Sequence, residues 1–443
     1  MEDFVPTRGV RLALRVCTIS LAFLLGFSLC GANAAAGEIE FAHIPAFESH
    51  DNLQGLVTGV DPDDYKVAVY IYVPPYGWWT KPYAFSPLTS IAGDSAWTCD
   101  ITTGGQDECA TKITAFLVPN GYDLPLGEGQ QCLASELYQY PYAEVIRYEK
   151  ISFSGYDWWV KRSCDPVGPG PNYFSDGDQD VWVDPNGWLH LRIVQRDGNW
   201  YCSEVIADAN LGYGTYVFTI EGRVDLLDQN MVLGLFTWQD CAAQYNYREI
   251  DIELSRWGDP ANDNAQFVVQ PWNTPGNMYR FDVDLAGHPN EATTHEFTWQ
   301  PERIDFRSYY GDFSSSLLPE DLIAVWDYTG DDIPPAGGEN ARINFWLING
   351  DAPIDGEDVE IVIKSFQYLP PADFCGANFG PPDGYVDVWD LMQFSDHWHT
   401  RTGEGNWDAT FDLAGPNFGD ADGYIDVWDL MTFADNWHEG EKP

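Results

Sequence analysis

Residues 248–254 read Arg248-Glu249-Ile250-Asp251-Ile252-Glu253-Leu254. Acidic and aliphatic side chains alternate strictly in this stretch. A period of two is typical of a β-strand that packs one face in a core and turns the other face outward. Neighbours on one face lie about 6.5 to 7 Å apart along the strand, so each acid raises the pKa of the next one. The stretch therefore predicts a strand with three carboxylates of unequal proton affinity on one face.

This pattern suits the cleavage of glycosidic bonds. A retaining glycosidase needs one ionised carboxylate as nucleophile and a second, protonated one as acid, and neighbouring acids can divide these duties. The motif alone also fits a solvated acidic strand face, because 69 of the 443 residues are Asp or Glu and such triplets arise by chance. The segments around the strand decide between the two interpretations.

Five segments extend the pattern, two upstream of the acids, one directly before them and two downstream. They are Tyr201–Glu204 (YCSE), Leu211–Tyr216 (LGYGTY), Gly234–Trp238 (GLFTW), Thr294–Ile304 (THEFTWQPERI) and Ile343–Trp346 (INFW). In order and spacing, residues 155 to 369 resemble glycoside hydrolase family 16, in its lichenase and laminarinase branches.

The resemblance implies a jelly-roll β-sandwich of two bent antiparallel sheets with a concave cleft. It also implies that Glu249 is the nucleophile, that Glu253 is the general acid and base, and that Asp251 between them tunes the pair. No cofactor is needed for this chemistry. The expected function is that of a secreted retaining endo-glycosidase acting on a β-linked polysaccharide, a β-glucan or a marine galactan. The alternative is a catalytically inactive, lectin-like carbohydrate-binding protein.

Substrate contacts are expected from one acid and several aromatic side chains. The resemblance gives Glu204 a role in holding substrate, but the arginine that commonly follows two positions later is replaced by Ile206. Flat aromatic rings stack on sugar rings, although core packing is an equally good interpretation of each tryptophan taken singly. The candidates for stacking are Trp238, Trp257, Trp272 and Trp346.

The first 150 residues divide in two. Residues 1–36 are expected to be a signal peptide, since three arginines precede an apolar run that ends in Ala32-Asn33-Ala34. This predicts a secreted protein, extracellular or associated with the cell surface, without a membrane span. Residues 37–150 are expected to form an accessory β-sandwich domain, because runs such as Lys66–Val73 (KVAVYIYV) are typical of strands. Its Trp78-Trp79 pair fits either core packing or a platform for sugar rings.

The tail, residues 371–443, follows the catalytic candidate domain at 151–370 and repeats itself. The stretch that begins at Asp373 returns 39 residues later at Asp412, with acids and aromatics in register. Acids spaced around a glycine suit a calcium loop, and the apolar spacing of residues 391, 394 and 398 predicts a helix after it. The calcium-ligand candidates are Asp373, Asp383, Asp387, Asp390, Asp412, Asp420, Asp422, Asp426 and Asp429. The repeat resembles a type I dockerin, which implies bound Ca²⁺ and a cohesin-bearing scaffold or cell-surface protein as partner.

Charge and cysteine content bound the remaining possibilities. A formal net charge of −47 argues against nucleic acid or an anionic membrane as partner, because binding phosphates requires a surface that neutralises them. Export into an oxidising compartment favours disulfides. Seven cysteines follow the expected signal peptide, so at least one thiol must be left over. Cys99 with Cys109 and Cys164 with Cys202 are the preferred pairs, although sequence does not fix the connectivity.

Overall fold

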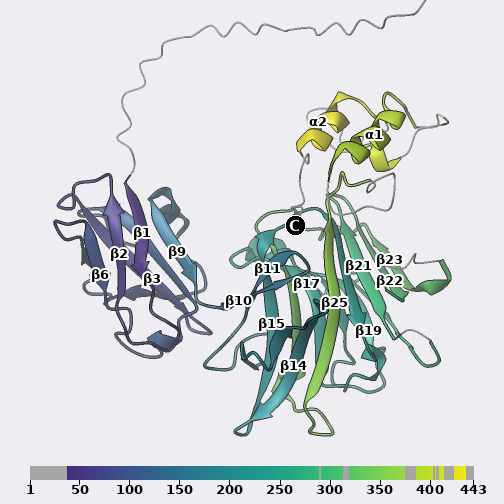
Figure 1. Cartoon of the computed structure of the whole chain (residues 1–443), viewed down its shortest axis with the longest axis horizontal. Helices are drawn as coiled ribbons and strands as arrows, with labels where there is room; N and C mark the ends of the chain where they lie inside the picture. The colour runs from purple at the N-terminus through teal and green to yellow at the C-terminus, as the bar shows by residue number, and fades with distance from the viewer. Residues whose placement is uncertain are drawn as a thin grey trace, which may run out of the picture. The chain divides into compact units, whose positions relative to one another are not determined.

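The computed structural model describes residues 37–288, 291–312, 319–374, 386–402, 405, 409–413 and 424–435. The expected signal peptide at 1–36 lies outside these residues. The predicted fold class is confirmed: the described chain is mainly β, with a large sheet that folds into a jelly roll and two short helices near the end (Figure 1). No helix within the described ranges has the length and apolarity needed to cross a membrane.

Residues 37–150, here called the N-terminal region, form two antiparallel sheets. One sheet has the order β1-β2-β6, and the other has the order β8-β4-β3-β7-β9 with β5 beside β3. Strand β3 has apolar side chains on both faces: Val67 and Val69 pack in one buried cluster, and Ala68 and Tyr70 pack in another. The strands are β1 (Glu38–His43), β2 (Leu53–Thr58), β3 (Tyr65–Val73), β4 (Gly77–Lys81), β5 (Leu88–Ser90), β6 (Ala96–Cys99), β7 (Lys112–Pro119), β8 (Glu128–Gln130) and β9 (Tyr142–Ile146).

The larger sheet contains sixteen strands of the described chain and runs in the order β20-β19-β18-β17-β24-β15-β14-β25-β16-β21-β22-β23 (Figure 1). Strands β10 and β11 extend it beside β15, and short strands β12 and β13 flank β15 and β14. The strands are β10 (Glu149–Phe153), β11 (Tyr156–Val160), β12 (Tyr173–Phe174), β13 (Val181–Val183), β14 (Leu189–Arg196), β15 (Asn199–Asn210), β16 (Gly214–Glu221), β17 (Met231–Trp238), β18 (Ile250–Leu254), β19 (Ala265–Val269), β20 (Met278–Phe281), β21 (Thr293–Trp299), β22 (Ile304–Tyr310), β23 (Leu322–Tyr328), β24 (Asn340–Leu347) and β25 (Val359–Leu369).

The sheet bends over on itself, so its two halves face each other across one core. Phe267 of β19 stacks on Phe306 of β22, with the ring centroids 5.0 Å apart, although the two strands lie far apart in the strand order. Short 3-10 helices connect some strands. They are η1 (Asp107–Cys109), η2 (Ser135–Gln139), η3 (Val224–Leu226), η4 (Ala243–Arg248), η5 (Pro319–Asp321), η6 (Ile348–Gly350) and η8 (Ala409–Phe411).

Strand β18 has the alternation that the sequence predicts. Ile250, Ile252 and Leu254 are buried in the core of the jelly roll, which turns the acids of this strand to the opposite face. The start of the strand is pinned by Thr237, whose hydroxyl donates to the carbonyl of Arg248 at 2.8 Å and accepts from the amide of Ile250 at 3.3 Å. These contacts fix the register of the acids against β17.

The predicted disulfides are wrong. The bonds join Cys109 to Cys164 and Cys132 to Cys241, with sequence separations of 55 and 109 residues. Cys99 and Cys202, which were expected to bond to Cys109 and Cys164 respectively, are buried free thiols. Both lie on strands with side chains that point into hydrophobic cores, so tertiary packing, which the sequence alone does not give, decides which cysteines pair. Cys375 lies outside the described residues.

Two helices form in the tail, as the repeat predicts: α1 (Val388–His397) and α2 (Val427–Asp435). They pack through Phe394 and Phe433, whose ring centroids are 5.3 Å apart, with Phe374 and Phe411 completing the small core. At the start of α1, Asp387 accepts from the amide of Trp389 at 2.8 Å and Asp390 accepts from that of Asp387. This reciprocal arrangement is a capping box.

Candidate active site

The three acids of the motif meet at one cavity. Glu249, Asp251 and Glu253 all line a hollow of about 620 Å³ on the outward face of β18 and its neighbours. Asp251 is 3% exposed, whereas Glu249 and Glu253 are half-buried and accessible from the cavity. The structure thus places all three carboxylates on one face, as the alternation in the sequence predicts.

Glu249 reaches this cavity from a sharp turn. It follows η4, where Asn246, Tyr247 and Arg248 have φ values of 49°, 59° and 55°. Such left-handed conformations are uncommon for residues other than glycine and turn the chain abruptly. Gln239 holds the turn by accepting from the Arg248 guanidinium at 2.6 Å. The acid therefore enters the cavity from a braced segment.

Strand pairing arranges the floor of the cavity in rows across the sheet. Glu253 of β18 pairs with Gly234 of β17, which pairs with Asn344 of β24, which in turn pairs with Glu204 of β15. A side chain at position 234 would clash, because a Cβ there would lie 2.4 Å from the Asn344 Oδ1 atom. Glycine at this position leaves room for Asn344 beside the acid.

The next row begins at Asp251. This residue pairs with Phe236 of β17, which pairs with Arg342 of β24, and Arg342 pairs with Ile206 of β15. The Arg342 guanidinium lies 3.5 Å from the Glu204 carboxylate, and the Lys161 ammonium lies 2.7 Å from it. The arginine that the resemblance places at position 206 is absent, but cations from the neighbouring strand and from the end of β11 reach the same glutamate.

Burial raises the pKa of every acid in the motif. Burial first, and then repulsion from Glu253, raise the pKa of Glu249 to about 8, while Arg342 and a hydrogen bond with Asp251 oppose this shift. Burial raises the pKa of Glu253 to about 7 against a 2.6 Å hydrogen bond donated by Gln266. Neither glutamate is a simple surface carboxylate at neutral pH.

Asp251 is the most deeply buried of the three acids. Burial raises its pKa well above the ordinary value, and the charges of Glu249 and Glu253 raise it further. Its side chain is hydrogen-bonded to Glu249, and it accepts from Gln270 at 3.0 Å. A protonated Asp251 donates to Glu249, and this donation favours the ionised form of Glu249. The site can therefore hold one ionised and one protonated glutamate together.

No family model matches the chain. No curated protein matches it either. Solved structures do match, at low identity. One is a β-1,3-1,4-glucanase (lichenase) derived from a mouse hindgut metagenome, 18% identical with a TM-score of 0.37, which covers 50% of this chain and 99% of its own. Another is a laminarinase from Flavobacterium sp. UMI-01, 11% identical with a TM-score of 0.36, which covers 48% of this chain and 92% of its own. A third is a family 16 glycoside hydrolase from Bacteroides ovatus, in complex with a G4G4G3G product, 12% identical with a TM-score of 0.37, covering 48% and 94%.

The predicted tryptophans separate into two groups. Trp238 and Trp346 line the cavity, and Trp238 stacks on Tyr247 with ring centroids 4.3 Å apart and the planes within 4°. Trp257 packs edge-on against Trp346 and does not line the cavity. Trp272 is 61% exposed and lies outside the lining, on a turn held by a 2.9 Å bond from its amide to Gln270.

Sequence reasoning missed the polar residues that support the acids. Arg342 and Asn344 line the cavity, and Gln266 and Gln270 bind Glu253 and Asp251. The signal for two of them was present, since Asn340, Arg342, Asn344 and Trp346 alternate with apolar residues along β24. Gln266 and Gln270 carried no such signal, because only strand pairing brings them beside the acids.

Four of the described acids of the tail, Asp387, Asp390, Asp426 and Asp429, accept hydrogen bonds from backbone amides. Asp390 accepts from the amides of Phe374 and Asp387, at 2.7 and 2.8 Å, and Asp429 accepts from those of Leu413 and Asp426, at 2.6 and 2.7 Å. Both carboxylates are buried. Among the described residues no group of three or more His, Cys, Asp or Glu side chains is placed to hold a metal ion. Asp383, Asp420 and Asp422 lie outside these residues.

Proposed function

We propose that this protein is a secreted, retaining endo-glycosidase that hydrolyses a β-linked polysaccharide. The observation that carries the proposal is the joint placement on one cavity of Glu249, just before β18, and of Asp251 and Glu253 on β18, with Asp251 bonded to Glu249. Retaining chemistry needs two carboxylates that act together, one ionised and one protonated. The cavity volume, about 620 Å³, suits a few sugar rings.

The reaction would proceed in two steps. Glu253 donates its proton to the glycosidic oxygen while Glu249 attacks the anomeric carbon, which gives a covalent glycosyl-enzyme and frees the leaving sugar. Glu253 then removes a proton from water, and the water releases the second sugar from Glu249. The anomeric configuration is retained because each step inverts it.

The order of the two pKa values needs an explanation, since Glu249 has the higher one. Positive charge develops at the anomeric carbon as the bond breaks. That charge faces Glu249 and favours its ionised form, so the proton shared by the pair moves to Glu253. Arg342 adds to this preference, because its positive charge lowers the pKa of Glu249.

Substitution of each glutamate tests the proposal. Glu249→Gln should abolish the release of reducing ends from β-glucans or galactans, by at least about 10³-fold, while glycan binding persists. Gln keeps the size and hydrogen-bonding shape of Glu but cannot attack carbon. Equal activity of variant and wild type would overturn the assignment. Binding without cleavage in the wild-type protein would instead support a lectin-like module.

The tail would tether the enzyme. We propose that the duplicated segment binds Ca²⁺ through its loops, which include Asp383, Asp420 and Asp422, and docks on a cohesin-bearing scaffold or cell-surface protein. The likeness of the two helix starts supports a true duplication, because Asp387 and Asp426 make the same bond to the amide two residues on. The remaining candidate ligands are Asp373, Asp390, Asp412 and Asp429.

A further inference from the structure

The cavity that holds the acids is not lined by the jelly roll alone. Tyr72 of β3, Lys112 of β7, Gln131 after β8 and Tyr148 after β9 also line it, and all four belong to the N-terminal region. Tyr72 donates from its hydroxyl to Gln131 Oε1 at 2.6 Å. Polar groups of the N-terminal region therefore face the same space as Glu249.

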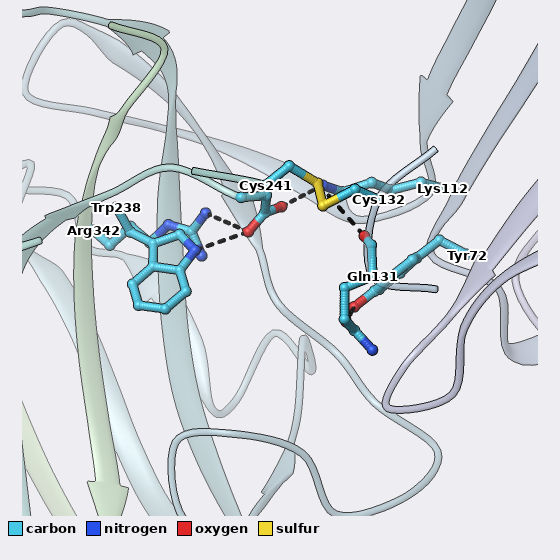
Figure 2. Close-up of a disulfide and its surroundings, with 8 residues drawn as sticks. Tyr72, Lys112, Gln131, Cys132, Trp238, Cys241 and Arg342 are labelled. Carbon is cyan, nitrogen blue, oxygen red and sulfur yellow. Dashed lines mark hydrogen bonds and ion pairs between the residues drawn. A yellow bond between two sulfur atoms is a disulfide. The ribbon is translucent and has the colours of Figure 1, made fainter. Parts of the chain in front are cut away.

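A disulfide ties this part of the N-terminal region to the jelly roll close to the cavity. Cys132 follows Gln131 in sequence, and its partner Cys241 lies three residues after Trp238 and eight before Glu249. Figure 2 shows the bond with Lys112, Gln131 and Tyr72 on one side and Trp238 and Arg342 on the other. The second bond, from Cys109 to Cys164, ties the same two parts of the chain at another point.

An ionic bridge continues the link to the cavity floor (Figure 2). Lys112 Nζ lies 2.6 Å from Asp240 Oδ2. The other oxygen of Asp240 accepts from Trp238 Nε1 at 2.9 Å and lies 3.4 Å from the Arg342 guanidinium. One carboxylate thus couples a lysine of the N-terminal region to two residues of the floor. An ammonium group has three hydrogens, so Lys112 can hold Asp240 and still donate to a sugar hydroxyl.

We propose that the N-terminal region forms one wall of the active site and supplies a sugar subsite, in which Lys112 and Tyr72 determine substrate specificity. The proposal rests on the proposed function. The subsite would bind one ring of a neutral glycan, with the ring face on Trp238 and its hydroxyls on Lys112 and Tyr72. Six carboxylates and four cationic side chains line the cavity, and three of the six are the motif acids with raised pKa values, so charge alone does not draw in a sulfated or uronic chain.

Oligosaccharides of increasing length test the wall. Lys112→Met and Tyr72→Phe should weaken binding of a β-glucan hexasaccharide by about tenfold, the effect of losing one hydrogen bond to a charged group or slightly less for the hydroxyl. The loss should grow with length, because short ligands can bind at the acids without reaching the wall. Lys66→Met and Tyr65→Phe are matched controls, since both residues lie on β3 and outside the cavity lining. Equal loss at every length, or none, would overturn the proposal.

The disulfide gives an independent variant. Cys132→Ser with Cys241→Ser keeps the Cys109–Cys164 bond, so the N-terminal region stays attached while the wall loses its nearer tie. KM for the hexasaccharide should rise about tenfold, and that for a disaccharide less. If these values equal those of the wild type, the wall is not a subsite.

Binding and cleavage are measured separately to keep the two proposals apart. Dissociation constants are taken in the Glu249→Gln background, and KM and kcat in the wild-type background. If the wild type cleaves glycan but Lys112→Met and Tyr72→Phe behave like their controls, only the proposal of a sugar subsite in the N-terminal region is contradicted. Wild-type protein that cleaves no glycan contradicts the hydrolase, while the binding series still tests the wall.

Discussion

At the scale of single residues, the site depends on how burial distributes protons among three acids. Asp251 is nearly inaccessible to water, and burial, the neighbouring acids and a hydrogen bond with Glu249 raise its pKa well above the ordinary value. Glu249 and Glu253 lose their protons around pH 8 and pH 7. Interacting groups of this kind titrate as a set, so the useful quantity is the pH range in which the glutamates together hold one proton.

That range predicts the pH dependence of activity. Below about pH 7 both glutamates are protonated and the nucleophile is lost, and above about pH 8 both are ionised and the acid is lost. The value of kcat/KM should therefore peak near neutral pH and fall on both sides. Gln266→Ala removes the hydrogen bond that lowers the pKa of Glu253. The pKa of Glu253 should therefore rise, and the limb of the profile that depends on Glu253 should move to higher pH. An optimum below pH 5 would contradict the raised values.

Stability should respond to pH at the same residues. The pKa of Asp251 is raised on folding, so the unfolded chain loses its proton first and stability falls as pH rises above about 4, the unfolded value. Asp251→Asn should therefore raise Tm relative to the wild type at pH 8, with a smaller difference at pH 4.

Asp240 supplies the opposite control. Desolvation opposes the shift, but Arg342 and Lys112 hold the pKa of Asp240 well below normal. The Asp240 side chain is 51% exposed and solvent screens these ion pairs, so Asp240→Asn should cost a modest amount of stability at pH 7, and less as pH falls below about 4. Thermal unfolding followed by circular dichroism at several pH values checks both signs. The same pH trend for both variants would contradict the account.

At the scale of elements, strand alternation divides structure from chemistry. On β18, Ile252 packs in the core while its neighbours on either side face the cavity, and on β17, Gly234 keeps the row beside Glu253 clear. The sequence pattern predicted this strand because a period of two is local. It did not predict Arg342 opposite Ile206 or Gln266 beside Glu253, because those contacts follow from strand order and register.

A pair of substitutions separates the two faces. Ile252→Val should cost about 1 kcal/mol of stability, a Tm change of a few degrees, without change in kcat. Gly234→Ala should lower kcat/KM, because the added methyl group displaces Asn344 next to the acid. Thermal melts and initial rates of both proteins check this division. A kinetic defect in Ile252→Val and none in Gly234→Ala would contradict the arrangement of the rows.

At the scale of the whole molecule, the features that the sequence did not predict depend on contacts between residues far apart in the chain. The jelly roll was predicted through the resemblance of residues 155 to 369 to a known family, whereas the β-rich N-terminal region and the two tail helices were predicted from local periodicity and turn residues. The disulfides were not, because Cys132 and Cys241 are 109 residues apart and their pairing depends on how two sheets meet. The participation of the N-terminal region in the cavity was missed for the same reason.

The tail makes its own prediction at this scale. If its loops bind Ca²⁺, the full-length protein should gain helical signal and a higher Tm on addition of the metal, and EGTA should reverse both, because metal that binds the folded form alone stabilises it. Mg²⁺ serves as the control cation, since it prefers a smaller octahedral site. An unchanged spectrum and Tm with Ca²⁺ would leave the repeat without a metal role.

The most direct measurement of the central claim is rescue by azide of alanine variants on an activated aryl β-glycoside. Azide can enter the space left by Glu249→Ala and attack the anomeric carbon directly, so the account predicts a glycosyl azide of inverted configuration. In Glu253→Ala the nucleophile remains, and azide replaces water in the second step, which gives the retained configuration. Proton NMR of the products distinguishes the two. Retention in the Glu249 variant, or no rescue in either, would contradict the assignment of Glu249 as nucleophile and Glu253 as acid and base.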